Sequence, residues 1–370
     1  MDLVTGYIVP FLIVLSIIVF VHEFGHYLLA RLNGVRVQTF SIGFGRELFG
    51  FNDRHGTRWK FSLLPLGGYV KMLGDADATS STTDVEAARA PDSFPAKSVG
   101  QRMAIVAAGP AANFVFAILV LAVLFATAGR PFTPAEVGFV REDGPAAAAG
   151  LQVDDRIVEV DGQPIASFEE LQDLVRDSAG QTLSIAVVRD GEEIVLSITP
   201  ELSEVTDRFG NEHRMGLIGV GRAGMEFRKS NPATAVFEAT GETWRITTMT
   251  LDALWQMVVG ARGTEDLGGP LRIAQISGQV AQEGLVPTLW LMAVLSINLG
   301  LINLFPIPML DGGHLALYSI EAACGRPLTE RSQEWAFRVG LALVLSLMVF
   351  ATWNDLVHLR VVDFFAGLVS

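Results

Sequence analysis

Residues 7–31 read YIVPFLIVLSIIVFVHEFGHYLLAR, and this stretch decides the fold. No residue from Tyr7 to Val21 is charged, and after a polar interruption the apolar run continues to Arg31. At 1.5 Å per residue a helix over this stretch is roughly 36 Å long, enough to cross a hydrocarbon core about 30 Å thick. We expect a retained membrane helix and not a cleaved signal peptide, because a basic start is missing and the run is too long for a signal-peptide core.

The composition agrees with a membrane protein. Half of the 370 residues are hydrophobic (50%), only 18% are charged, and the mean hydropathy is +0.39, whereas soluble domains carry about 25% charged residues. Three further apolar runs, 103–128, 285–305 and 339–353, bring the expected number of spans to four. The net charge of −13 argues against nucleic acid as a partner, because duplex binding needs a basic face. The single cysteine excludes an intramolecular disulfide and a cysteine-based zinc cluster.

Basic residues near the ends of the spans predict the orientation of the chain. The segment between the first and second spans is rich in Lys and Arg, while the tail before the first span has none. We therefore expect this segment on the cytosolic side and both termini, with the long segment between spans two and three, on the periplasmic side. The basic residues of the first loop are Arg31, Arg36, Arg46, Arg54, Arg58, Lys60, Lys71, Arg89 and Lys97.

Three ionisable residues interrupt the first span, in the sequence His22-Glu23-Phe24-Gly25-His26. A charged side chain at the bilayer centre costs about 2.5–3.5 kcal/mol even on a lenient scale, so such residues indicate function. Residues four apart share one helix face, and His22 and His26 can therefore direct two imidazole nitrogens at one zinc ion. Glu23 is placed to act as general base on a water molecule, as in zinc peptidases with the His-Glu-x-x-His pattern.

A catalytic zinc keeps three protein ligands and one open position, so a third ligand must come from elsewhere. The third apolar run ends in NLFPIPMLDGGH, residues 303–314, where two prolines prevent an α-helix from continuing. Irregular backbone at membrane depth is tolerated where it is buried in protein or lines a wet cavity. Asp311 is the favoured third ligand and His314 the alternative. Asn303 is either a core hydrogen-bonding residue or a contact to the substrate backbone.

These motifs together resemble the site-2 protease family of intramembrane zinc metalloproteases, and within it the bacterial type that includes the regulator of sigma-E protease. The likeness covers nearly the whole chain. It includes Gly109-Pro110-Ala111-Ala112-Asn113, similar to the family's second-span motif, and residues 41–45 and 65–72, similar to its membrane-re-entrant β-hairpin. The resemblance implies the zinc ligands His22, His26 and Asp311, the base Glu23, and substrate contacts by Asn303 and by Gly43, Phe44 and Gly45 in the hairpin.

The hairpin can also be read from its residues. Tyr, Phe, Val and Trp lie between glycines, with a charged tip at residues 52–56, and this pattern predicts two strands and a turn. A sheet edge near the active site would let an unwound substrate pair as an added strand. A plain cytosolic hairpin remains the alternative. The polar stretch Thr79–Ala90 is expected to be a flexible linker.

Residues 130–202 have the composition of a soluble domain. Residues 144–151, GPAAAAGL, precede DDRIVEVDG at 154–162, and the pair resembles a PDZ domain of the bacterial protease type, although Asp154 stands where such domains usually have Gly. Two alternating strands flank a turn at Asp190-Gly191. We expect a peptide groove with Val137–Val140 as its carboxylate-binding loop. Two roles compete: peptide capture that activates the enzyme, or a size filter against bulky ectodomains.

Residues 232–261 mix apolar and charged residues in a pattern typical of an amphipathic helix, which lies either on the membrane surface or against the PDZ domain. The predicted fold is a polytopic α-helical membrane protein of about four transmembrane helices, with a membrane-re-entrant β-hairpin and one inserted PDZ domain of α+β type. The predicted segments are a first span with the zinc motif (1–32), the hairpin region and linker (33–99), a second span (100–129), the PDZ domain (130–202), a connecting region (203–284), a third span (285–314) and a fourth span (330–360).

The predicted function is that of a zinc endopeptidase of the bacterial inner membrane, embedded in the lipid bilayer. By resemblance, its substrates are single-span membrane proteins such as an anti-sigma factor, or remnant signal peptides, cut in regulated intramembrane proteolysis. Two other classes are a membrane scaffold with a structural metal and a metal transporter. A structural site would have four protein ligands, and a transporter would have ligands on several spans; the sequence offers three good ligands on two spans.

Overall fold

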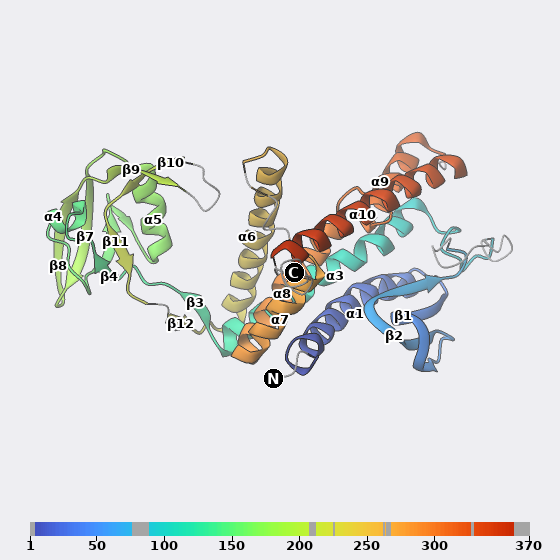
Figure 1. Ribbon diagram of the computed structural model, residues 1–370. Helices are drawn as coiled ribbons and strands as arrows, with labels where there is room; N and C mark the ends of the chain where they lie inside the picture. The colour runs from blue at the N-terminus through green and yellow to red at the C-terminus, as the bar shows by residue number, and fades with distance from the viewer. Residues whose placement is uncertain are drawn as a thin grey trace, which may run out of the picture. The chain divides into compact units, whose positions relative to one another are not determined.

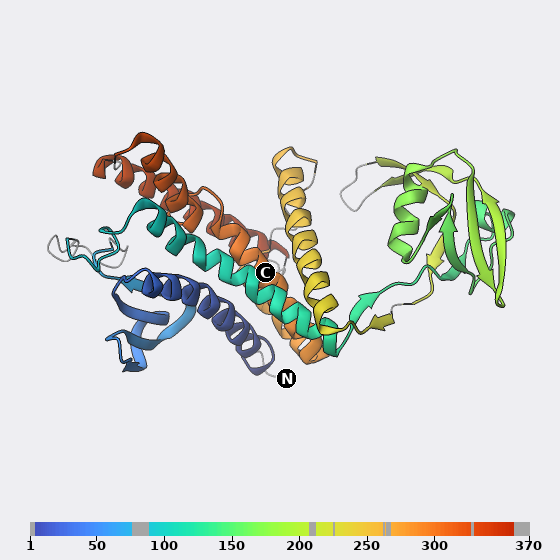
Figure 2. The same cartoon turned by 180° about the vertical axis from the view of Figure 1, so that it is seen from behind.

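The computed structural model describes residues 4–75, 89–206, 212–224, 226–261, 263, 268–326 and 329–358 (Figures 1 and 2). It consists of two compact units. The membrane unit comprises Met1–Leu124, Ala235–Trp255 and Thr264–Ser370, and the β-rich unit comprises Phe125–Thr234 and Gln256–Gly263. Most of the predicted linker Thr79–Ala90 lies outside the described residues.

Four helices of the described chain are long and apolar enough to cross a membrane, as the sequence predicts. The first span comprises a π-helical turn η1 (Val4–Ile8) and α1 (Val9–Leu32). The others are α3 (Val99–Thr127), α8 (Leu285–Asn303) and α10 (Glu330–His358). Each contains an apolar 18-residue window with at most two charged residues. Helices of this length and composition indicate a multi-pass membrane protein.

Small residues let α1 and α3 approach closely. A Cβ added at Gly25 of α1 would overlap the carbonyl of Ala108 and lie 2.8 Å from the Cβ of Ala112, both on α3. In lipid, helices gain little from burying apolar surface against one another, so close packing at small residues drives their association. This contact fixes the distance between α1 and α3 at the level of the His-Glu-x-x-His motif.

The predicted hairpin is formed by β1 (Val37–Asn52) and β2 (Arg58–Met72), which pair as antiparallel neighbours and pack on α1. The pair is folded on itself. Residues 39–42 of β1 pair with 68–71 at the end of β2 and also with 58–61 at its start. Within the described chain, residues 68–72 pair only with β1, so this segment forms an outer edge of the sheet.

The remaining helices of the membrane unit are α6 (Pro232–Val258), α7 (Pro270–Glu283) and α9 (Asp311–Cys324). Helix α7 packs on α1, α8 and α10. The amphipathic helix predicted at 232–261 is α6, and its central part, Ala235–Trp255, belongs to the membrane unit. The hydroxyl of Thr250 on α6 donates to Asn298 on α8, 3.3 Å away. The helix therefore contacts a span directly.

The β-rich unit contains a four-stranded sheet in the order β6-β5-β7-β8 and three further strand pairs, β3-β12, β4-β11 and β9-β10. Helix α5 (Phe168–Asp177) starts with a capping box between Ser167 and Glu170, and α4 is the short helix Pro145–Ala148. The strands are β3 (Arg130–Phe132), β4 (Val137–Val140), β5 (Arg156–Val160), β6 (Gln163–Pro164), β7 (Leu183–Arg189), β8 (Glu192–Ile198), β9 (Glu201–Thr206), β10 (Glu212–Leu217), β11 (Val220–Arg222) and β12 (Glu226–Arg228).

The predicted domain of residues 130–202 extends further along the chain in the structure. Strand β11 pairs with β4, and Ile218, just before it, is 3% exposed within the apolar core. The turn at Asp190-Gly191 forms as predicted, with both φ angles positive. Asp154 adopts a φ of 71°, so this aspartate takes the left-handed conformation that glycine usually provides at this turn.

A carboxylate inside the β-rich unit ties its turns together. Asp155 is 1% exposed, and its oxygens accept hydrogen bonds from Nε and an Nη of Arg189 at 2.7 and 2.6 Å and from the backbone nitrogen of Gln152 at 2.8 Å. Burial alone would raise the pKa of Asp155, but these hydrogen bonds outweigh burial and lower the pKa. The stability that Asp155 contributes is therefore present above its unfolded pKa and is lost as the pH falls below it.

In the membrane unit, Asp355 of α10 is 1% exposed and caps the start of α7. Its carboxylate accepts hydrogen bonds from the backbone nitrogens of Gly269, Leu271 and Arg272 at 2.7, 2.9 and 3.2 Å. These are donors that a helix cannot satisfy by itself. The contact anchors the fourth span to α7, and through α7 to the first span.

We expect Asp355→Ala to lower the free energy of unfolding by about 1–2 kcal/mol, the upper range for losing a helix cap, because three buried backbone donors lose their acceptor. Thermal unfolding of the full chain in detergent measures the loss. Asp355→Asn keeps one acceptor oxygen, so its unfolding temperature should lie between those of wild type and Asp355→Ala. Equal unfolding temperatures for Asp355→Ala and wild type would contradict the capping role.

Candidate functional site

Helix α1 carries two buried histidines one turn apart. His22 and His26 are 8% and 9% exposed, and their rings lie 4.9 Å apart, centroid to centroid. The uninterrupted apolar sequence before them makes this turn helical, and the i, i+4 spacing puts both rings on one face. The Nε2 atoms are 3.3 Å apart, close enough to share one ion.

The chain between α8 and α9 delivers Asp311 to the same place. Backbone nitrogen of Leu310 donates to the carbonyl of Ile307 at 3.0 Å, and Met309 has a φ of 87°, so Pro308 and Met309 occupy the centre of a tight type II turn. Asp311 then starts α9. A Cβ at Gly312 would overlap the carbonyls of Leu304 and Phe305, which explains why glycine follows the aspartate.

The three side chains form a triangle of ligand atoms. Oδ2 of Asp311 lies 3.1 Å from Nε2 of His22 and 3.5 Å from Nε2 of His26. Tetrahedral coordination with bonds of about 2.0–2.1 Å separates ligand atoms by about 3.3 Å, so these three edges fit a zinc ion. Among the described residues, these three form the group of ligand atoms close enough to hold a metal, and His314 is not part of it.

The contacts around the histidines also support a zinc site. Nδ1 of His26 lies 2.9 Å from the carbonyl oxygen of Ile105, which can only accept, so Nδ1 carries the hydrogen and Nε2 keeps its lone pair. In the described part of the chain, Oδ2 of Asp311 and Nδ1 of His22 have no hydrogen-bond partner. A buried carboxylate oxygen without a donor is costly, and a cation between the three groups would satisfy it. The residues therefore fit zinc.

The ligand triangle opens on a cavity of about 320 Å³. Glu23, Asn303 and His314 all line it, together with residues at the end of β2. The amide nitrogen of Asn303 donates to the carbonyl of Leu299 at 3.0 Å. The hairpin residues of the lining are Gly68, Tyr69, Val70 and Met72.

Gly68 lies directly against α1 beside Glu23. A Cβ added at Gly68 would be 3.1 Å from Cγ of Glu23. The predicted substrate contacts Gly43, Phe44 and Gly45 are outside the residues that line the cavity, and Phe44 instead stacks on Tyr69 with ring centroids 6.2 Å apart. Of the two hairpin stretches identified in the sequence, residues of 65–72 thus line the cavity and those of 41–45 do not. The Gly67-Gly68 pair marks this approach in the sequence, because only a small residue lets a strand lie so close to a helix.

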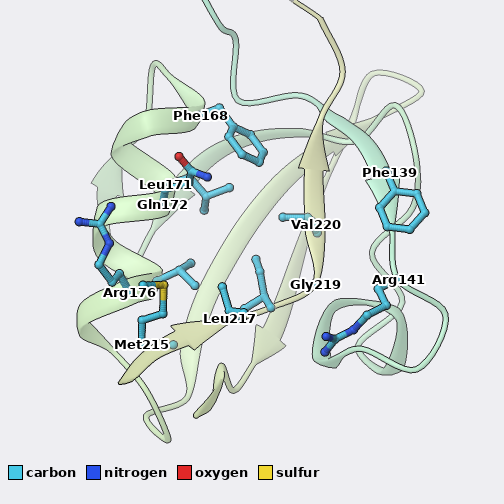
Figure 3. Close-up of a pocket in the computed structure, with 13 residues that line it drawn as sticks. Phe139, Arg141, Phe168, Leu171, Gln172, Arg176, Met215, Leu217, Gly219 and Val220 are labelled. Atoms are coloured by element: carbon cyan, nitrogen blue, oxygen red, sulfur yellow. The ribbon is translucent and has the colours of Figure 1, made fainter. Parts of the chain in front are cut away.

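A second cavity, of about 650 Å³, lies within the β-rich unit (Figure 3). One side is α5, with Phe168 and Leu171, and the other is the segment from Met215 to Val220. The prediction of a loop at Val137–Val140 is wrong, because these residues form strand β4 and pair with β11. Of these four residues, Phe139 lines the groove, which is also bordered by Gly216-Leu217-Ile218-Gly219. In the sequence, this second segment is marked by two glycines that enclose two apolar residues between strands.

An apolar four-span fold with a buried His-His-Asp triangle and an adjacent glutamate defines a membrane metallopeptidase. The model of peptidase family M50 matches residues 10–347, and the chain belongs to this family. It is 47% identical over 361 residues to Atu1380 of Agrobacterium fabrum, a candidate zinc metalloprotease by name, covering 95% of this chain and 96% of that protein. It is 38% identical over 391 residues to metalloprotease MmpA of Caulobacter vibrioides, covering 98% of both. The protein is a zinc metalloprotease of the site-2 type, which confirms the resemblance seen in the sequence.

Solved structures that match part of the chain include two bacterial proteins. The PDZ domain of an SdrC-like protein from Listeria monocytogenes is 25% identical, with a TM-score of 0.20, covering 25% of this chain and 88% of that one. The HtrA-type protease AlgW with a decapeptide is 35% identical, with a TM-score of 0.18, covering 18% of this chain and 21% of that one.

Gly109 of α3 lies against the ring of His26, and an added Cβ there would overlap Nε2. We expect Gly109→Ala to displace this ring and to weaken zinc binding by about 10–100-fold, the usual range when the support of a ligand is disturbed. Zinc content measured during titration with a chelator tests this. Gly100→Ala on the same helix is the matched control, because its Cβ would meet nothing within 4 Å. Equal zinc affinity in the two variants would contradict the packing argument.

Proposed function

We propose that His22, His26 and Asp311 hold the zinc ion and that the enzyme cleaves a transmembrane segment of single-span membrane proteins. The observation that carries the proposal is the ligand triangle between the first span and the start of α9, among helices apolar enough to cross a membrane. Anti-sigma factors and remnant signal peptides are the substrate classes, by resemblance to the site-2 protease family. Cleavage there would be a step of regulated intramembrane proteolysis.

Glu23 acts as the general base. Zinc supplies Lewis acidity, which lets water lose a proton near neutral pH and polarises a carbonyl. Glu23 lines the same cavity as the ligands and follows His22 directly, so its carboxylate can take the proton of the attacking water and return it to the leaving amine. Asn303, at the end of α8, is positioned to contact the substrate backbone from the same cavity.

The outer edge of β2 is the proposed docking site for the scissile segment. A helix hides its amide carbonyls, so a transmembrane helix must unwind before hydrolysis. Gly68, Tyr69, Val70 and Met72 line the catalytic cavity. Within the described chain, residues 68–72 pair only with β1, which leaves an edge for an added strand. Phe44 supports this edge through its contact with Tyr69.

The apolar face of the hairpin supports a re-entrant position in the membrane. Its side chains project apolar surface that no described residue covers, which is costly in water. Phe44, Leu48, Phe49, Phe51, Phe61, Leu63 and Leu64 are between 41% and 65% exposed.

With the basic first loop on the cytosolic side, the protein lies in the bacterial inner membrane with both termini and the β-rich unit in the periplasm. The cut falls toward the cytosol, because His22 and His26 lie in the half of the span nearer Arg31.

The β-rich unit acts as a PDZ-type peptide-binding domain. Its groove between α5 and residues 215–220 offers apolar side chains from both walls and backbone from Gly216 and Gly219 (Figure 3). An extended peptide with an apolar last residue fits this chemistry. Capture of such a peptide would activate cleavage; the competing role is a size filter that needs no peptide.

We expect Glu23→Gln to retain zinc and membrane insertion but to lose at least about 10²–10⁴-fold of the cleavage rate, the contribution of a general base. The measurement is cleavage of a co-expressed single-span reporter, with zinc content determined on the purified protein. Asp92→Asn, which removes the charge of a half-buried carboxylate paired with Arg36, is the control and should cleave at the wild-type rate. Cleavage by Glu23→Gln at the wild-type rate would contradict the role of Glu23 as general base.

For the groove, we expect Phe139→Ala to weaken binding of a fluorescent decapeptide with a free carboxylate and a C-terminal valine by roughly fivefold or more, equal to about 1 kcal/mol. Phe139 borders the groove and is 61% exposed, so its loss should spare the fold. Val195→Ala is the control, since Val195 is equally exposed at 62% and lies outside the groove. Fluorescence anisotropy measures both; unchanged affinity in Phe139→Ala would contradict peptide binding there.

A further inference from the structure

One carboxylate in the hairpin turn makes two kinds of contact. Oδ1 of Asp53 accepts hydrogen bonds from the backbone nitrogens of His55 and Thr57, at 2.8 and 2.9 Å, and these shape the turn. Oδ2 accepts from the hydroxyl of Tyr27, at 3.0 Å, and from Nε1 of Trp59, at 3.1 Å. Tyr27 belongs to α1 and Trp59 to β2. The second oxygen therefore joins the sheet to the catalytic helix.

Aromatic packing surrounds this polar contact. The ring of Trp59 lies 5.1 Å from that of Tyr27 and is stacked on that of Phe40 at 4.2 Å, centroid to centroid. Phe40 is 1% exposed and also meets Phe20 of α1 at 5.6 Å. Apolar packing gives the sheet its affinity for α1, but it tolerates sliding. The hydrogen bonds of Asp53 specify one position, because their geometry is directional.

Backbone pairing connects this contact to the catalytic cavity. Trp59 pairs with Phe40, and Phe40 pairs on its other side with Val70. Val70 lines the cavity that contains the ligand triangle. Trp59, Phe40 and Val70 thus form one row across the sheet, and a displacement of the Trp59 strand is passed through paired backbones to the edge strand.

Two contacts on neighbouring turns of α1 relate the sheet to the catalytic base. Gly68 lies against Glu23, and Asp53 holds Tyr27, four residues further along the same helix face. With both contacts made, the edge strand has one position relative to the base and the ligands. Losing the Asp53 contact leaves the van der Waals contact of Gly68 and the aromatic packing, neither of which is directional in the way a hydrogen bond is.

We propose that Asp53 is a positioning residue for the protease reaction: its carboxylate bridges Tyr27 and Trp59 and so holds the edge strand 68–72 at the distance from Glu23 that cleavage needs. The inference rests on the proposed function of that strand as the substrate docking site. Asp53 itself touches neither substrate nor metal ligands.

The charge state of Asp53 agrees with this role. Partial burial alone would raise its pKa, but the hydrogen bonds from Trp59, Thr57, His55 and Tyr27 outweigh burial and lower the pKa to about 2. A folded pKa below the ordinary value of 3.8 means that the stabilisation is complete above about pH 4 and is lost only as the pH falls toward 2. At any pH used for an assay, the bridge is charged and its hydrogen bonds are of the stronger, charge-assisted kind.

Asp53→Asn separates the two kinds of contact. The asparagine keeps one oxygen for the backbone donors of the turn, so the hairpin still closes. Its amide group then faces Trp59 Nε1, a donor that needs an acceptor, and the bridge is lost. Glu47→Gln is the matched control, because Glu47 is a carboxylate of the same hairpin but pairs with Arg58 of β2 and not with α1.

For the full-length Asp53→Asn enzyme in detergent, we expect kcat per zinc-loaded chain to fall by roughly 10- to 100-fold, the scale of a small misplacement of reacting groups, with KM nearly unchanged. Zinc content should equal that of wild type. Hydrogen exchange of the backbone amides of residues 68–72 should accelerate. Tyr27→Phe should give a smaller loss, and the double variant should be no slower than Asp53→Asn alone, because both changes remove one interaction.

Unchanged kcat together with unchanged exchange at residues 68–72 would overturn the positioning role, while cleavage that still requires Glu23 would leave the proposed function intact. Faster exchange at residues 68–72 with unchanged kcat would overturn the docking role of the edge strand, and the inference with it. A loss of zinc in parallel with activity would show a purely structural effect and would also overturn the proposal. The supporting result also requires that Glu47→Gln has the kcat and KM of wild type.

Discussion

The structure depends on one electrostatic requirement: two imidazoles and a carboxylate buried at membrane depth must be satisfied together. Oδ2 of Asp311 lies 3.1 and 3.5 Å from the Nε2 atoms of His22 and His26, and it makes no hydrogen bond within the described part of the chain. Ionisable groups in such surroundings are tolerated only when paired or bound to a metal. A zinc ion held as proposed would therefore stabilise the fold of this region as well as supply its chemistry.

Small residues and prolines make that closure possible. Gly25 and Gly109 bring α1 and α3 together, so that the ring of His26 is held between Gly109 and the carbonyl of Ile105. The turn at Pro308 and Met309 follows α8 and lets α9 begin at Asp311. Gly312 packs against the carbonyls of Leu304 and Phe305, just after α8. Helix interruption at this depth would be costly in lipid, but here it lines the catalytic cavity, where protein and water can satisfy its backbone.

The hairpin adds what a bundle of helices lacks, namely a free strand edge beside the site. Its sheet is fixed on α1 by aromatic packing around Phe40 and by the carboxylate of Asp53, and its end, Gly68, lies against Glu23. The β-rich unit has a separate apolar core and its own groove, so recognition there and catalysis in the membrane use different surfaces.

The sequence by itself determined the four spans, the shared face of His22 and His26, the helix break near Pro308 and the Asp190-Gly191 turn, because each depends on local periodicity or on the conformational limits of one or two residues. Packing between distant segments settles the rest: in the membrane unit, the edge strand at Gly68 beside the ligands, the bridge from Asp53 to Tyr27 and the cap from Asp355, and in the β-rich unit the groove at residues 215–220. Strand register and contacts between distant segments are set by how whole elements pack, and no local pattern encodes the position that packing selects.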